Sequence, residues 1–180
     1  MSTIHPNLTM RELLEISPGA QRALFRRYHI GGCSSCGFRP DETLQQVCER
    51  NENLPVDEVV AYIEASHEED LKIQIAPGDL NELLKSGQSL KLIDIRTREE
   101  FETAPLPGAE LFTQEMMQES LMKWDRAGLI VFFDHQGRRS MDAAAYFIGH
   151  GFSNVKSLRG GIDAWSQEVD SSVPRYRLEA

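Results

Sequence analysis

The apolar, β-favouring run Val131–Phe133 leads directly into the loop Asp134–Arg139, and an alanine-rich helical pattern begins at Ser140. A buried strand that passes through a short loop into a helix is typical of α/β folds. Such a loop points backbone N–H groups and the positive end of the helix dipole at one place. The sequence therefore predicts an anion-holding loop with Asp134 at its mouth.

The pattern of the rest of this half supports an α/β fold. Helical segments are predicted from Pro77 to the breaker Gly87, and from Ser140 to about Gly149 with Gly151 just beyond its end. Strands alternating with helices predict a largely parallel sheet covered on both faces. The predicted strands are Ile73–Ile75, Leu90–Ile95, Leu129–Phe133 and Val155–Leu158.

Residues 1–66 have a different pattern and predict a small all-helical domain of four helices. Thr9 and Glu12 have the spacing of a capping box, and Asp41 is the predicted cap of the third helix. The charged residues 67–71 are predicted to be a linker, so that the second domain covers residues 72–180.

The second domain resembles the rhodanese family of sulfurtransferases over roughly residues 72–176. The resemblance implies an α/β rhodanese-like fold, a parallel sheet flanked by helices. It is carried by motifs in the family's order: Asp94-Ile95-Arg96 with Glu100-Phe101, Ala104-Pro105-Leu106-Pro107-Gly108-Ala109, Gly137 with Arg139-Ser140, Gly151-Phe152-Ser153-Asn154-Val155, and Leu158-Arg159-Gly160-Gly161 with Trp165.

The family's active loop begins with a cysteine, and Asp134 stands at that position here. Rhodanese-type transfer needs a thiolate that becomes a persulfide, which a carboxylate cannot do. We therefore expect an inactive rhodanese loop in which Asp134 supplies the negative charge. An aspartyl nucleophile for phosphate is the less favoured alternative, because no metal or acid–base motif accompanies it. The predicted anion-binding residues of the loop are His135, Gln136, Gly137, Arg138, Arg139 and Ser140, with His135 and Gln136 as exposed loop residues.

The candidate reactive thiols are Cys33 and Cys36, a Cys-x-x-Cys pair surrounded by glycines. The pair is compatible with redox work, persulfide chemistry, or a zinc or iron–sulfur site. A closed metal site would need His29, Cys48 or a second subunit. We expect Cys48 to be a core thiol, because it lies on the apolar stripe of its helix.

The helical domain resembles a small DUF1858-like domain of bacterial proteins with a Gly-x-x-Cys-x-x-Cys loop. The matching sequence segments are Thr9–Leu14, Gly32-Cys33-Ser34-Ser35-Cys36 and Glu42-Thr43-Leu44. A related domain opens proteins linked to iron–sulfur repair, so this resemblance implies iron–sulfur or persulfide chemistry.

The net charge of −9 argues against nonspecific binding to nucleic acid or to anionic membranes. Three cysteines do not suggest a disulfide framework, and the start of the chain lacks a secretory pattern, so a cytoplasmic location is expected.

Three functions remain open from the sequence. The leading one is an accessory, non-catalytic role in sulfur or iron–sulfur handling, with Cys33 and Cys36 as reactive or metal-binding thiols and a protein partner from such a pathway. The second is a sulfurtransferase that uses a Cys33 or Cys36 persulfide at the Asp134 loop. The third is a structural interaction module. A homodimer that pairs two Cys-x-x-Cys loops is compatible with each.

Overall fold

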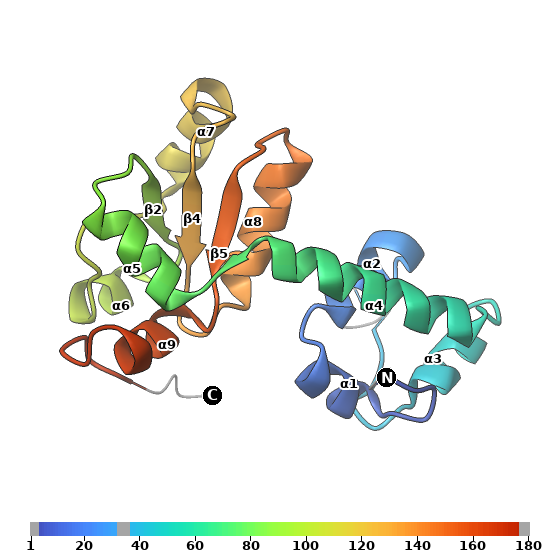
Figure 1. Ribbon diagram of the computed structural model, residues 1–180. Helices are drawn as coiled ribbons and strands as arrows, with labels where there is room; N and C mark the ends of the chain where they lie inside the picture. Colours follow the sequence, from blue (N-terminus) through green and yellow to red (C-terminus); the bar gives the residue numbers. More distant parts are fainter. Residues whose placement is uncertain (1–3, 32–36, 177–180) are drawn as a thin grey trace. The chain divides into compact units, whose positions relative to one another are not determined.

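The computed structural model describes residues 4–31 and 37–176. The chain divides into two compact units, Met1–Lys72 and Ile73–Ala180. The first unit is helical and the second contains the sheet (Figure 1). No helix within the described ranges is long and apolar enough to cross a membrane.

The first unit contains the four predicted helices, α1 (Met10–Ile16), α2 (Ala20–Tyr28), α3 (Leu44–Arg50) and α4 (Val56–Lys72). Each helix places part of its apolar stripe in one common core. This core includes Leu13, Leu24, Leu44, Val59 and Ile63, all fully buried. A shared core of this kind holds together helices that are too short to be stable alone.

Capping explains where two of these helices begin. The predicted box at α1 is confirmed, because the Thr9 hydroxyl accepts from the Glu12 backbone and the Glu12 carboxylate accepts from Thr9 N. The prediction for α3 was wrong, since Thr43 rather than Asp41 is its cap. Thr43 has Gln46 three residues later, which completes a second capping box.

The predicted linker 67–71 is helical and forms the end of α4. This segment contains no glycine or proline that would break a helix. Two ion pairs fit a helical conformation there, Asp70 with Arg22 of α2 and Glu69 with Lys72 on the same helix. Charge in this segment therefore marks a solvated helix face, and the unit boundary falls after Lys72.

The second unit contains a five-stranded sheet in the order β1-β5-β4-β2-β3, in which every neighbouring pair is parallel. The sheet confirms the predicted α/β class. Its strands are β1 (Gln74–Ile75), β2 (Lys91–Asp94), β3 (Ala109–Leu111), β4 (Ile130–Phe133) and β5 (Val155–Leu158). The helices are α5 (Pro77–Lys85), α6 (Arg98–Thr103), α7 (Gln114–Lys123), α8 (Arg139–Gly149) and α9 (Gly161–Glu168).

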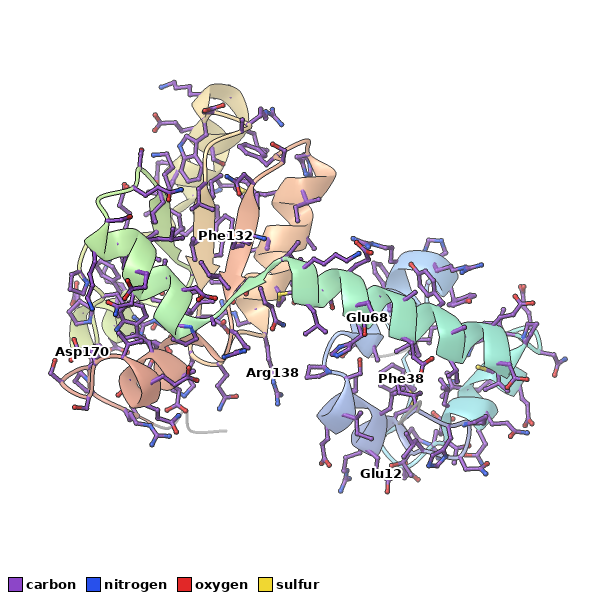
Figure 2. All side chains as sticks on the ribbon, viewed as in Figure 1. Glu12, Phe38, Glu68, Phe132, Arg138 and Asp170 are labelled. Carbon is purple, nitrogen blue, oxygen red and sulfur yellow. The ribbon has the colours of Figure 1, made fainter. Side chains whose placement is uncertain are left out.

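The central strand β4 is buried on both faces, and its side chains alternate between two cores. Val131 and Phe133 pack in the core that contains residues of α5 and α9. Ile130 and Phe132 pack in the other core, with residues of α7 and α8 (Figures 1 and 2). The helices on both faces make β4 rigid, so the loop at its carboxyl end starts from a fixed point.

Candidate functional site

The carboxyl ends of the parallel strands β2, β4 and β5 meet at one edge of the sheet, which is where α/β folds place their sites. The loop between β4 and α8 begins there with Asp134, which is only 4% exposed. The Arg96 residue that follows β2 and Ser157 of β5 are buried at the same edge.

The Asp134 carboxylate accepts three hydrogen bonds from its own loop and the start of α8. Its Oδ1 accepts from Gly137 N at 2.7 Å and from the Ser140 hydroxyl at 2.8 Å. Its Oδ2 accepts from Arg139 N at 3.1 Å. Hydrogen bonds to an ionised acceptor are each worth about 1.5–3 kcal/mol. The loop groups that were predicted to donate hydrogen bonds to an external anion therefore donate them to the Asp134 carboxylate.

The Ser140 hydroxyl also lies 2.8 Å from the Ser157 hydroxyl, and both serines are fully buried. The serine pair ties the first turn of α8 to the neighbouring strand β5. The carboxylate therefore has a second layer of support that fixes its donors in place.

The first turn of α9 closes the other side of the loop. Ile162 N donates to the Asp134 carbonyl at 2.9 Å, and Asp163 N donates to the His135 carbonyl at 3.1 Å. This approach requires glycine at position 161, because a Cβ there would lie 2.4 Å from the Asp134 carbonyl oxygen and φ is +61°. Gly161 is thus a packing requirement of the loop.

Gly161→Ala is expected to lower the free energy of unfolding by about 2–4 kcal/mol, because a left-handed residue gains a Cβ against fixed backbone. The control is Gly78→Ala in α5, where a Cβ meets nothing within 4 Å and φ is not left-handed. That variant should be slightly stabilising, by about 0.5–1 kcal/mol. Denaturant unfolding measures the stability of both variants. Equal changes in the free energy of unfolding would contradict the packing role of Gly161.

A buried ion pair lies beside the loop. Arg96 Nε and Nη2 donate to the Asp94 carboxylate at 2.9 and 2.5 Å, and Nη2 also donates to the Ala104 carbonyl at 2.8 Å. Burial works to lower the pKa of Arg96, but hydrogen bonds to Asp94 and Tyr176 outweigh it and raise the pKa above the usual value. The guanidinium is therefore a permanent, fixed charge.

The exposed residues of the loop are Gln136, Arg138 and Arg139. Figure 2 shows the Arg138 side chain extending away from the sheet at the surface of its unit. The Arg139 guanidinium is partly held, since Nη2 donates to the Ile95 carbonyl at 3.4 Å. The predicted anion-binding residues thus fall into two groups, an inner set around Asp134 and an exposed basic rim.

The prediction for His135 was wrong, because this residue is 7% exposed rather than an exposed loop residue. The ring of Tyr176 lies over its imidazole, with 4.5 Å between the ring centroids. Gln136 is exposed as predicted. Sequence reasoning gave Tyr176 no role, and nothing in its local pattern indicates a contact with residues about 40 positions away.

Cys33 and Cys36 lie outside the described residues. Cys48 is 1% exposed in the helical core, as predicted. Its burial, and to a smaller extent the negative charge of Glu49, raise the pKa of its thiol. His29 is the left-handed C-cap of α2. Within residues 4–31 and 37–176, no group of three His, Cys, Asp or Glu side chains has the arrangement of a metal site. A protonated core thiol is a poor ligand, so we derive no metal chemistry from Cys48.

Comparison with known proteins identifies the fold family of the second unit. The model of the rhodanese-like domain matches residues 76–168, just over half of the chain. Thiosulfate sulfurtransferase GlpE of Pseudomonas aeruginosa is 32% identical over 92 residues, which are 51% of this chain and 82% of that protein.

A longer relative is the adenylyltransferase and sulfurtransferase UBA4 of Candida albicans, 32% identical over 119 residues. The match covers 59% of this chain and only 26% of UBA4, so the chain spans about a quarter of that relative. A rhodanese-like domain protein of Staphylococcus aureus is similar in structure, with a TM-score of 0.47 and 22% identity over 58% of this chain and 98% of that one. With the family model matched from β2 to β5 and across the Asp134 loop, the chain belongs to the family of proteins with a rhodanese-like domain.

Proposed function

We propose that this protein is an accessory, non-catalytic member of the rhodanese-like family that handles sulfur through Cys33 and Cys36. The observation that carries the proposal is the Asp134 carboxylate, which stands where the family's cysteine is expected and accepts hydrogen bonds from Gly137, Arg139 and Ser140. Relatives named as sulfurtransferases support sulfane sulfur as the chemical class.

The Asp134 loop lacks the chemistry for sulfur transfer. A thiolate attacks the outer sulfur of thiosulfate, forms a new S–S bond, and releases sulfite with the electron pair of the broken bond. A carboxylate has no sulfur with which to hold the product as a persulfide. The cysteines of the chain are at positions 33, 36 and 48, so the rhodanese-like unit contains no alternative thiol.

The loop is proposed to act as a recognition surface. Its inner donors are engaged by Asp134, which leaves the exposed Arg138 and Arg139 to contact a partner. Two arginines at a helix N-terminus suit an acidic protein surface. The internal carboxylate holds the loop in one shape, so the basic rim is presented without a bound ligand.

The thiols are tested by the intact mass of the protein after anaerobic treatment with thiosulfate or polysulfide. Wild type is expected to gain sulfur that is removed by a reducing agent, because a thiolate that attacks the outer sulfur of the donor keeps it as a persulfide. Cys33→Ser and Cys36→Ser identify the site, and the double variant, which retains buried Cys48, serves as the control and should gain none.

Metal content of the same samples gives the decisive contrast. Stoichiometric iron or zinc that is lost in Cys33→Ser would contradict the persulfide role and identify a metal site. Wild type that gains neither sulfur nor metal would also contradict the proposal and would leave the interaction-module function.

A further inference from the structure

Residues 170–176, which follow α9, are anchored in the rhodanese-like unit. After a turn that begins at Asp170 (Figure 2), Val173 is 6% exposed and packs in the core. Its carbonyl accepts from the buried Ser166 hydroxyl at 2.7 Å. Val173 thus fixes the point from which residues 174–176 extend towards the Asp134 loop.

The Tyr176 hydroxyl links Arg96, which follows β2, to Glu100 of α6. The oxygen accepts from Arg96 Nη1 at 2.7 Å, and the O–H donates to Glu100 Oε1 of α6 at 2.8 Å. Burial raises the pKa of Tyr176 to about 12, so the neutral phenol keeps both its donor and its acceptor. The ring of the same residue covers His135.

A buried nitrogen of His135, by contrast, favours the release of Tyr176. Its Nδ1 is buried and has no hydrogen-bond partner within the described part of the chain. A buried polar atom without a partner is unfavourable, and it gains hydrogen bonds when water reaches it. Release of Tyr176 would expose this nitrogen, so hydration of His135 partly compensates for the contacts that Tyr176 loses.

The remaining contact of the segment is weak. The Arg175 guanidinium donates to both oxygens of Asp163, at 2.7 and 3.1 Å, but its side chain is 56% exposed. Exposed ion pairs add little to stability. Tyr176 is therefore the principal closing contact of residues 174–176.

We propose that Pro174–Tyr176 form a latch over the Asp134 loop, closed when Tyr176 lies between Arg96, Glu100 and His135 and open when Tyr176 is released. Opening uncovers His135, the neighbour of Asp134, and changes the surface that a partner of the loop would meet. The latch adds regulation to the recognition role proposed above. Its existence rests on the contacts of Tyr176 and not on that function.

Diethyl pyrocarbonate, which acylates accessible histidine nitrogens, reports directly on the latch in the full-length chain. Peptide mass mapping gives the modification rate at each histidine. In wild type, His135 should react far more slowly than the exposed His150. In Tyr176→Ala the rate at His135 should rise by about tenfold or more, because the ring and two hydrogen bonds are lost. Tyr176→Phe, which keeps the ring, should give a smaller increase.

The chain offers a matched control in Tyr146, whose ring lies 4.1 Å from the His150 ring on α8. Tyr146→Ala should leave the rate at His135 as in wild type. Equal rates at His135 and His150 in wild type, or an unchanged His135 rate in Tyr176→Ala, would overturn the latch. Amide exchange of β4 should stay slow in Tyr176→Ala. If the exchange rate of β4 rose by the same factor as the modification rate at His135, the variant would be unfolding generally, and the latch would also be overturned.

Discussion

Asp134→Cys is expected to gain thiosulfate-to-cyanide sulfurtransferase activity, on the order of 10²-fold above the wild-type rate. The donors of Gly137 and Arg139 already converge on this side chain, at 2.7 and 3.1 Å from its oxygens. Backbone N–H groups at a helix N-terminus lower the pKa of a cysteine and stabilise its thiolate. The variant thus places a nucleophile in a loop whose electrostatics are intact.

The reaction has two steps that can be followed separately. The thiolate that the substitution introduces would take the outer sulfur of thiosulfate and release sulfite, and cyanide would then remove that sulfur as thiocyanate. Asp134→Ser is the matched control, because a hydroxyl keeps a small polar side chain without a sulfur nucleophile, and it should stay at the wild-type rate. A folded Asp134→Cys protein that forms no thiocyanate would contradict the claim that the loop retains the family's geometry.

Arg96→Met is expected to lower the free energy of unfolding by about 3–5 kcal/mol, the largest stability effect that we expect from a single substitution at this edge of the sheet. The substitution leaves the fully buried Asp94 carboxylate without its partner. It also removes the donors to the Ala104 carbonyl and to the Tyr176 hydroxyl. An uncompensated buried charge is far more unfavourable than the loss of a surface pair.

Chemical denaturation measures the effect, with Arg98→Met as the control. Arg98 is exposed in the first turn of α6, two residues from Arg96, and its substitution should change stability by less than about 0.5 kcal/mol. In the double variant Asp94→Asn, Arg96→Met, much of the stability should return because the unpaired charge is gone. If Arg96→Met is no less stable than Arg98→Met, the pair does not hold this edge of the sheet together.

Local sequence patterns were sufficient to predict the parts of the fold that depend on neighbouring residues. The apolar strand Ile130–Phe133, the helix that follows it, and Gly151 just after that helix all lie where their patterns place them. Missed elements had weaker signals. Strand β3 has only three residues at the edge of the sheet, and α6 has six residues after its Thr97–Glu100 capping box.

The candidate site was predictable where it depends on one loop and not where it depends on distant segments. Asp134, Gly137 and Arg139 belong to one continuous motif, and they do lie together. The contacts of Tyr176 join residues 76 and 80 positions apart, which no local pattern encodes. The sequence does not predict the burial of His135 for the same reason, since the residue that covers it is far away in the sequence.

The non-catalytic role is tested most directly by the initial rate of thiocyanate formation by wild type and by the Cys33→Ser, Cys36→Ser double variant. Both rates are expected to stay at the background at saturating thiosulfate, since Asp134 leaves the loop without a sulfur nucleophile. Wild-type turnover that the double variant loses would contradict the non-catalytic role and show that a Cys33 or Cys36 persulfide is a catalytic intermediate. Turnover that the double variant retains would contradict the role assigned to Asp134 itself.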